Sequence, residues 1–211
     1  MAVLMVSNTV AIKLIQIGPF VFTGAIFIFP ISYIFGDILT EVYGYRATRK
    51  IIWSGFAALL FMSLAYTLVL RLPAAPFWKD QAAFESILGL VPRVVIASVV
   101  GYLMGEFVNS YIMSKVKTLM DGNHLWVRTI GSTIVGEGVD TIFFVSILFG
   151  GVLPLTEILT IMWSGYLFKV LYEIVATPIT YLIVRKVKEY EGIDTYDRNI
   201  NYTPFSFSEE K

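Results

Sequence analysis

The stretch IIWSGFAALLFMSLAYTLVL, residues 51–70, runs for twenty residues without a charged side chain. About 20 consecutive apolar residues in a helix are enough to cross the hydrocarbon core of a bilayer. Five further apolar runs lie at 1–18, 19–39, 87–113, 126–153 and 155–184. The sequence therefore predicts six transmembrane helices within residues 1–188, followed by a polar and mobile tail at 189–211.

The composition also indicates a membrane protein. Apolar residues make up 56% of the chain, charged residues 15%, and the mean hydropathy is +0.72. Soluble domains hold about 45–50% apolar and about 25% charged residues, so this chain has more apolar surface than one soluble core can bury. An ordinary cytosolic enzyme and a disordered chain are excluded. We expect an all-α, polytopic fold in contact with membrane lipid, and no strands, because the runs are continuous and do not alternate.

Charge and residue usage narrow the function classes. The formal net charge is zero, so no basic field attracts nucleic acid. The chain has no cysteine and one histidine, His124, which excludes thiolate and histidine-rich metal sites. The sequence contains no phosphate loop, zinc-binding helix or nucleophile elbow. We therefore expect no metal, no cofactor and no enzymatic activity.

Lysine and arginine are distributed unevenly between the predicted links. Eleven fall after the second span, after the fourth span and in the tail: Arg46, Arg49, Lys50, Lys115, Lys117, Arg128, Arg185, Lys186, Lys188, Arg198 and Lys211. The opposite side carries Arg71, Lys79, Arg93 and, depending on the first span, Lys13. Because cytoplasmic loops carry the positive excess, we expect an inner (plasma) membrane protein with both termini in the cytoplasm. The run at 1–18 is the weakest span and begins abruptly, so either it is a short helix or the natural start lies upstream.

Polar side chains interrupt the apolar runs, and each is costly in hydrocarbon unless it has a partner or a function. They occur in pairs: Asn8 and Lys13, Asp37 and Glu41, Glu106 and Asn109, Glu137 and Asp140, Lys169 and Glu173. Lys169 and Glu173 are four residues apart and are predicted to pair on one helix face. Glu137 and Asp140 share a face, so three acids in the last two spans meet one base. This excess needs a proton, a cation or a donor-rich ligand; the structural alternative is hydrogen bonding within or between helices.

The small residues of the fourth span and the aromatic residues of the last two spans can each serve packing or function. Ala97, Gly101 and Gly105 form a stripe at four-residue spacing, which lets another helix approach closely. That helix can belong to the same chain or to a second copy, so the stripe permits a homodimer without requiring one. The aromatic side chains of the last two spans can supply flat walls for a planar ligand, or can contact lipid or pack in the core.

Four segments resemble motifs of the queuosine precursor transporter family, also called the vitamin uptake transporter family. Gly36-Asp37-Ile38-Leu39-Thr40-Glu41-Val42-Tyr43-Gly44 resembles its TDxxTEVYG signature, and Gly136-Glu137-Gly138-Val139-Asp140-Thr141-Ile142-Phe143-Phe144 resembles GExxDSxxF. Lys169 to Glu173 with Thr177-Pro178 resembles KxxYE…TP, and Asn8 to Leu14 resembles NxxAxKL. The chain departs from the family at Gly36, where threonine is frequent, and at Thr141, where serine is common.

The resemblance implies a six-helix inner-membrane carrier that imports 7-cyano-7-deazaguanine or 7-aminomethyl-7-deazaguanine. These compounds are salvage precursors of queuosine, a modified tRNA nucleoside. The resemblance also implies a fold similar to the substrate-binding subunits of energy-coupling-factor vitamin importers, but one that works without an ATPase module.

Candidate site residues follow from matching such a ligand to the buried polar groups. A deazaguanine edge presents a ring N–H and an exocyclic amine side by side, and one carboxylate, Glu137 or Asp140, can accept both. Lys169, oriented by Glu173, is predicted to donate to the carbonyl oxygen. The other candidates supply hydrogen bonds (Asn8 and Lys13), ring walls (Phe143, Phe144 or Trp163) and, if import is proton-driven, relays (Asp37 or Glu41).

Three alternatives remain open at this point. A vitamin-binding subunit of an energy-coupling-factor importer would need a shared ATPase partner and would not transport alone. A membrane enzyme would convert a substrate without moving it, and its acids would need partners that this chain lacks. A structural membrane protein or assembly factor would leave the buried acids without a purpose.

Overall fold

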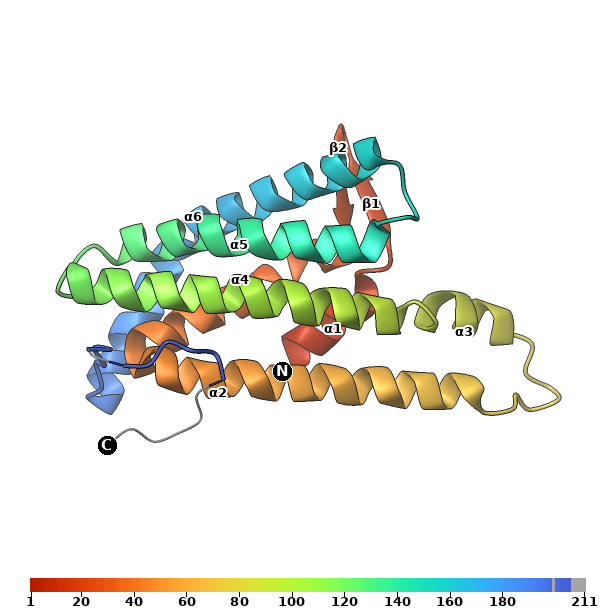
Figure 1. Ribbon diagram of the computed structural model, residues 1–211, viewed down its shortest axis with the longest axis horizontal. Helices are drawn as coiled ribbons and strands as arrows, with labels where there is room; N and C mark the ends of the chain where they lie inside the picture. The colour runs from red at the N-terminus through yellow and green to blue at the C-terminus, as the bar shows by residue number, and fades with distance from the viewer. Residues whose placement is uncertain (199, 206–211) are drawn as a thin grey trace.

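Long helices running side by side form the body of the protein in the computed structural model, which describes residues 1–198 and 200–205 (Figure 1). The elements in chain order are α1 (Ala2–Val10), β1 (Leu14–Ile17), β2 (Phe20–Thr23), the 3-10 helix η1 (Gly24–Phe27), α2 (Pro30–Arg71), α3 (Gln81–Leu88), α4 (Val91–Leu119), α5 (Leu125–Phe149) and α6 (Leu155–Glu191). Within the described residues, four helical stretches are long and apolar enough to cross a membrane: α2, α3 with α4 (Gln81–Leu119), α5 and α6. The predicted all-helical membrane fold is confirmed at this level.

Helix α2 contains the third predicted span and only residues 30–39 of the second, and it folds back on itself at Gly44. The backbone of Gly44 has φ 81° and ψ 170°, a conformation that glycine adopts without the steric cost of a side chain. The hydroxyl oxygens of Thr40 and Thr48 lie 3.1 Å apart, whereas eight residues of straight helix span about 12 Å. The rings of Tyr33 and Phe56 both pack against Tyr102, with centroids 6.1 and 5.8 Å away. Gly44 therefore separates two arms that run back along each other.

The first predicted span, 1–18, is not a single helix. Helix α1 ends at Val10, and β1 and β2 then pair antiparallel with Leu14 opposite Thr23 and Ile17 opposite Phe20. The prediction that the chain has no strands was therefore wrong for this segment. Its β-branched and aromatic residues favour strands, and the Gly18-Pro19 pair favours a turn.

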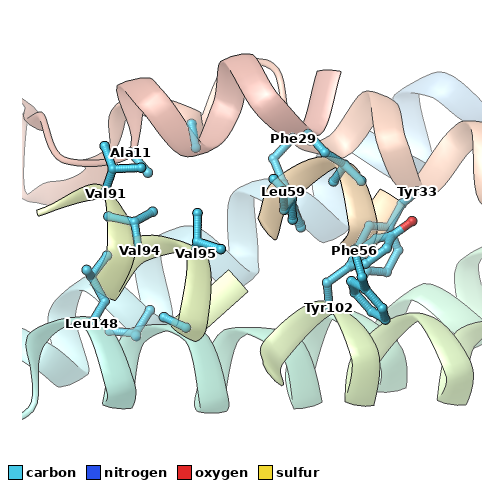
Figure 2. Close-up of a cluster of buried hydrophobic side chains, with 14 of the residues drawn as sticks. Ala11, Phe29, Tyr33, Phe56, Leu59, Val91, Val94, Val95, Tyr102 and Leu148 are labelled. Atoms are coloured by element: carbon cyan, nitrogen blue, oxygen red, sulfur yellow. The ribbon is translucent and has the colours of Figure 1, made fainter. Parts of the chain in front are cut away.

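Apolar side chains fill the space between the helices and also cover the outside. Figure 2 shows an aromatic group in which Phe29, Tyr33, Phe56 and Tyr102 meet, beside an aliphatic group around Val91 and Val94. Large apolar side chains are exposed along the outer faces: Phe61, Leu64 and Leu68 of α2, and Leu155, Leu159, Val175 and Leu182 of α6. An apolar exterior around buried charged groups is the arrangement expected of a protein whose surroundings are lipid.

Small residues bring α4 and α5 into close contact. A Cβ on Gly105 would lie 2.7 Å from the Asp140 Cβ and 2.7 Å from the Gly136 carbonyl oxygen. A Cβ on Gly101 would lie 2.9 Å from Oδ1 of Asp140. The small-residue stripe therefore packs within the chain, and this part of it is not free to bind a second copy.

The two ends of the helical body carry different links. Figure 1 places the Gly44 fold-back, the α4–α5 link and the C-terminal segment together at one end, and α3 and the α5–α6 link at the other. The described residues of the predicted positive group belong to that first end, whereas Lys211 lies outside the described residues. The N-terminus lies near the middle of the long axis, where Met1 approaches Gly55.

Candidate functional site

A buried lysine bridges two carboxylates at the centre of the helical body. The ammonium nitrogen of Lys169 on α6 lies 2.7 Å from Oε2 of Glu137 and 2.7 Å from Oδ2 of Asp140, both on α5. The Thr141 hydroxyl lies 3.4 Å from the same nitrogen. Residues three and four apart share a helix face, which explains why this stretch of α5 presents all three groups to α6. The predicted pair of Lys169 with Glu173 is wrong: the lysine bonds across to α5.

A small cavity of about 40 Å³ adjoins this lysine. It is lined by Ser7, Asn8, Ala11, Thr23, Ala25, Ile26, Phe29, Ser98, Asp140, Thr141, Phe144, Val145, Ile161, Gly165 and Lys169. Such a volume holds a few water molecules. Four of the predicted site residues, Asn8, Asp140, Phe144 and Lys169, are therefore brought together around one space.

Three predicted site residues lie elsewhere. The side chains of Phe143 and Trp163 are 39% and 61% exposed on the outer faces of α5 and α6. Lys13 is exposed in the turn before β1. Sequence alone did not identify the inner face of each helix, and these three residues do not line the cavity.

Phe29 was missed by the sequence analysis and completes the cavity wall. The Lys169 nitrogen lies 4.6 Å from the centre of its ring, within the range of a cation–π interaction. Phe29 precedes Pro30, where α2 begins, but nothing in that pattern indicates a ligand. Asn8 donates from Nδ2 to the Leu4 carbonyl at 2.8 Å, and its Oδ1, which is buried, has no partner among the described residues.

Asp37, Glu137 and Glu173 are buried but do not line the cavity. Asp37 accepts a 2.7 Å hydrogen bond from Nδ2 of Asn109, so the predicted interhelical role of Asn109 links α4 to α2. Glu173 lies one turn beyond Lys169 on α6, with Oε1 buried and lacking a partner in the described part of the chain. Glu137 contacts the cavity's lysine but is not part of the cavity wall.

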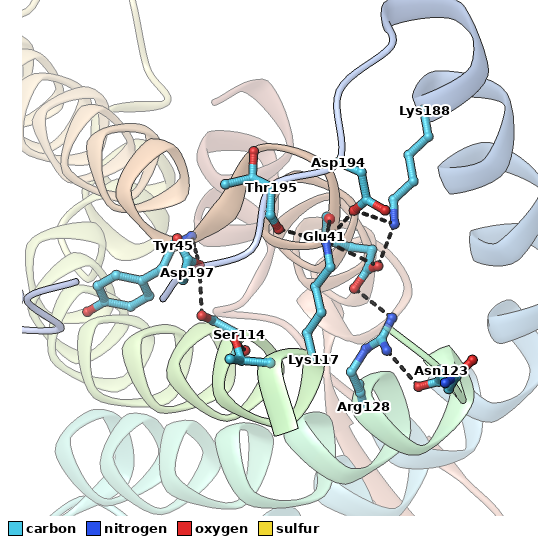
Figure 3. Close-up of polar contacts among 11 residues, drawn as sticks. Glu41, Tyr45, Ser114, Lys117, Asn123, Arg128, Lys188, Asp194, Thr195 and Asp197 are labelled. Atoms are coloured by element: carbon cyan, nitrogen blue, oxygen red, sulfur yellow. Dashed lines mark hydrogen bonds and ion pairs between the residues drawn. The ribbon is translucent and has the colours of Figure 1, made fainter. Parts of the chain in front are cut away.

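Glu41 has a different environment from Asp37. Its carboxylate lies 2.9 Å from Arg128, 2.7 Å from Lys188 and 3.5 Å from Lys117 (Figure 3). Three cations from α4, α5 and α6 thus hold one carboxylate at the end where the C-terminal segment lies. These contacts make Glu41 the centre of an ion-pair network that links α2 to α4, α5 and α6.

The described part of the C-terminal segment packs against this end of the protein and there differs from the predicted mobile tail, of which residues 199 and 206–211 lie outside the described residues. Asp197 accepts 2.7 Å hydrogen bonds from the Tyr45 backbone N–H and the Ser114 hydroxyl. Asp194 accepts from Lys117 at 2.6 Å and pairs with Lys188 at 2.9 Å (Figure 3). Partial burial opposes its ionisation, but these two ammonium groups hold the pKa of the Asp194 carboxyl below its usual value.

Long apolar helices around buried, charge-lined space define an integral membrane protein with an internal polar site. A family model described as "Putative vitamin uptake transporter" matches residues 23–183. A relative from Bacillus subtilis (strain 168), named "Probable queuosine precursor transporter", is 31% identical over 156 residues, which cover 74% of this chain and 68% of that protein. No solved structure matches the chain significantly. The chain belongs to the vitamin uptake transporter family, as its motifs predicted, and is a membrane transporter by class.

Proposed function

We propose that this protein imports 7-cyano-7-deazaguanine, 7-aminomethyl-7-deazaguanine or both across the inner membrane, to supply the modification of tRNA with queuosine. The name of the Bacillus subtilis relative supports this substrate class. In this proposal residues 1–188 form the transmembrane domain and residues 189–211 lie in the cytoplasm. The observation that carries the proposal is Lys169 held between Glu137 and Asp140 at the edge of the cavity.

The chemistry of the cavity matches the edge of a deazaguanine. Asp140 lines the cavity directly, so its carboxylate can accept the ring N–H and the exocyclic amine together. Lys169 can then donate to the ligand carbonyl while keeping its contact with Glu137. Phe29 and Phe144 lie on the wall as flat apolar surfaces for the ring. Oδ1 of Asn8, which lacks a partner in the described structure, is a further acceptor.

One side of the cavity wall is built from short elements near the N-terminus. Helix α1 contributes Asn8 to the wall, and the segment after β2 contributes Ala25; both elements are short. The hairpin contacts α6 through the Val21 N–H, 3.3 Å from the Ser164 hydroxyl, and through Phe22 against Phe168. Few polar bonds hold this wall, so it is the part we expect to move.

Binding to the purified protein in detergent tests the proposal. The panel holds both deazaguanines, guanine, queuine, biotin and riboflavin, and the readout is the melting temperature, which a ligand in excess raises by mass action. We expect a rise with the deazaguanines that Asp140→Asn abolishes and that Glu189→Gln, at an exposed acid of α6, leaves intact. A rise with biotin or riboflavin would instead support the vitamin-binding alternative. Silence across the panel from folded protein would overturn the proposed substrate class.

A further inference from the structure

Three carboxyl groups form a second buried acidic group, here called the inner acid cluster: Asp37 on α2, Glu106 on α4 and Glu173 on α6. Their side chains are 0%, 0% and 2% exposed. Glu106 lies against the backbone of Gly36, because a Cβ there would collide with its carboxyl oxygen. Asp37 has Glu173 and Glu106 as charged neighbours. The cluster thus joins three helices beside the Lys169 site, and it does not line the cavity.

The hydrogen bonding of the cluster is incomplete. Asp37 Oδ1 accepts from Asn109, and Glu106 Oε1 lies 3.5 Å from the Ser110 hydroxyl. Asp37 Oδ2, Glu106 Oε2 and Glu173 Oε1 have no partner among residues 1–198 and 200–205. A buried polar atom without a partner costs about 1–3 kcal/mol, and more when it is charged. One such oxygen on each of the three carboxyl groups indicates that something present in the working protein completes their hydrogen bonding.

An unpartnered hydroxyl group lies between Glu106 and the Lys169 site. The side chain of Tyr33 is 1% exposed, and its hydroxyl has no hydrogen-bond partner in the described part of the chain. The hydroxyl lies beside α4, 2.6 Å from the position that a Cβ on Gly105 would take. Gly105 is the residue before Glu106 in the chain. The charged neighbours of Tyr33 are Asp140, Glu137 and Glu106. A buried donor without a partner therefore lies between Glu106 of the cluster and the two carboxylates of the Lys169 site.

The charges of the cluster are not balanced by the described residues. No ion pair in the described chain involves Asp37, Glu106 or Glu173. The groups that face the cluster are Tyr33 and Glu41 from α2, Tyr102 from α4, Glu137 and Asp140 from α5, and Lys169 from α6. Lys169 is already shared by two carboxylates, and Glu41 has three cations of its own. An isolated carboxylate in a membrane interior is too costly to remain uncompensated.

A proton accounts for the uncompensated charge of the three carboxyl groups better than a metal ion does. No group of three or more His, Cys, Asp or Glu side chains in the described residues is arranged to hold a metal. We propose that Asp37, Glu106 and Glu173 form a proton-binding site whose occupation is coupled to substrate binding at Asp140 and Lys169. This inference rests on the proposed function, because it assigns the energy source of that import.

The sign of the coupling follows from the positions of the charges. Glu137 and Asp140 are the charged neighbours that Glu106 faces on α5. A proton on Glu106 removes a negative charge that repels the Asp140 carboxylate, and so favours the arrangement in which that carboxylate accepts the ligand's N–H groups. By linkage, ligand binding favours protonation of the cluster to the same extent. Proton and substrate then bind together, which is the condition for symport.

Binding and transport in proteoliposomes test this coupling, with 7-cyano-7-deazaguanine as the substrate. We expect the wild type to bind it roughly fivefold or more tightly at pH 6 than at pH 8, a typical size for coupling between sites. Wild type should accumulate substrate under an inward proton gradient, and a protonophore should abolish the accumulation. Glu106→Gln should lose the pH dependence and the accumulation but still exchange labelled for unlabelled substrate. Glu189→Gln, at an exposed acid, should behave as wild type.

The failures of the two proposals are distinguishable. Absence of binding and exchange at every pH overturns the substrate class. Accumulation driven by a sodium gradient, or unchanged accumulation in Glu106→Gln, Asp37→Asn and Glu173→Gln, overturns the proton site. If Glu106→Gln does not fold, the other two variants carry the test. Infrared absorption of protonated carboxyl groups gives a readout without substrate: a signal that none of the three variants reduces would also overturn the site.

Discussion

Phe143 and Phe144 are neighbours in the chain, but their rings face different surroundings. Phe144 lines the cavity, whereas Phe143 is exposed on the outer face of α5. Stacking of a base on an aromatic ring contributes about 1–3 kcal/mol. We therefore expect Phe144→Ala to weaken binding of 7-cyano-7-deazaguanine roughly tenfold or more, and Phe143→Ala to leave it unchanged. Titration calorimetry on both variants checks this, and equal losses would contradict the assignment of the cavity wall.

Single residues show what sequence reasoning could and could not find. Asn8, Asp140 and Lys169, which the sequence marks as polar groups inside apolar runs, line one cavity, because such groups need a partner or a ligand. The bonding of Lys169 was predicted wrongly, because spacing along one helix cannot show that α5 offers two carboxylates. Phe143 and Trp163 were misplaced for a related reason: in a membrane protein both helix faces are apolar, so hydrophobicity does not mark the inside.

At the scale of elements, the packing of α4 on α5 depends on Gly136. A Cβ there would lie 2.8 Å from the Asn109 Cβ and 2.9 Å from the Gly105 carbonyl oxygen. We expect Gly136→Ala to destabilise the protein by about 1–3 kcal/mol through overpacking. Gly131→Ala on the same helix meets nothing within 4 Å and should be neutral or slightly stabilising, because alanine favours helix. Thermal melting of both variants in detergent measures the difference, and similar melting points would refute this packing argument.

The C-terminal segment gives a prediction about pH through Asp194. Its lowered pKa means that the folded state favours the ionised carboxylate. This stabilisation is present above the unfolded pKa of about 4 and is lost as the pH falls through the lower folded value. At pH 7 we expect Asp194→Asn to lower stability by about 0.5–1 kcal/mol, a small amount because the side chain is partly exposed. The difference in stability between Asp194→Asn and the wild type should disappear as the pH falls toward 3.

Thermal melting between pH 7 and pH 3 checks this expectation. Glu189→Gln is the control, since Glu189 pairs with Arg185 on an exposed surface, where such pairs contribute little. A gap for Asp194→Asn that does not change with pH would mean that the contacts of Asp194 matter for their shape and not for their charge.

Two features, the hairpin at residues 14–23 and the break in α2 at Gly44, explain why the first part of the chain does not form the separate helices that the sequence predicts. Residues 14–23 form a hairpin because apolar runs of this length suit a strand as well as a helix, and hydropathy cannot separate the two. Gly44 lies in a polar link that sequence analysis treated as a loop, but the helix there is interrupted at a single residue. The later spans were predicted well, because α4, α5 and α6 are long and continuous.

At the scale of the whole molecule, polar groups lie inside and apolar groups outside. The carboxylates of the Lys169 site and of the inner acid cluster are buried between helices with Lys169, while the outer faces of α2 and α6 carry exposed large apolar side chains. Lipid is as apolar as these side chains, so burying them in a core gains little in a membrane. Close packing of small residues and polar bonding between helices therefore hold the bundle together. These contacts lie where the ligand is proposed to bind.

The distribution of links between the two ends predicts the orientation in the membrane. The links and segment that carry the positive excess lie at one end (Figure 1), and that end should face the cytoplasm. The chain has no cysteine, so a single introduced cysteine reports its own location. Tyr190 is 92% exposed at that end and Phe77 is 86% exposed at the other. We expect a membrane-impermeant thiol reagent to label Phe77→Cys in intact cells, and Tyr190→Cys only after the membrane is permeabilised.

The same experiment separates orientation from the number of spans. Asp121→Cys in the α4–α5 link should follow Tyr190→Cys, because both lie at the end with the positive links. If Tyr190→Cys and Asp121→Cys are labelled from outside while Phe77→Cys is not, the bundle is inverted and the charge argument fails. If only one of Asp121→Cys and Tyr190→Cys is labelled in intact cells, α5 and α6 do not both cross the membrane. The helical body would then have to lie differently in the bilayer.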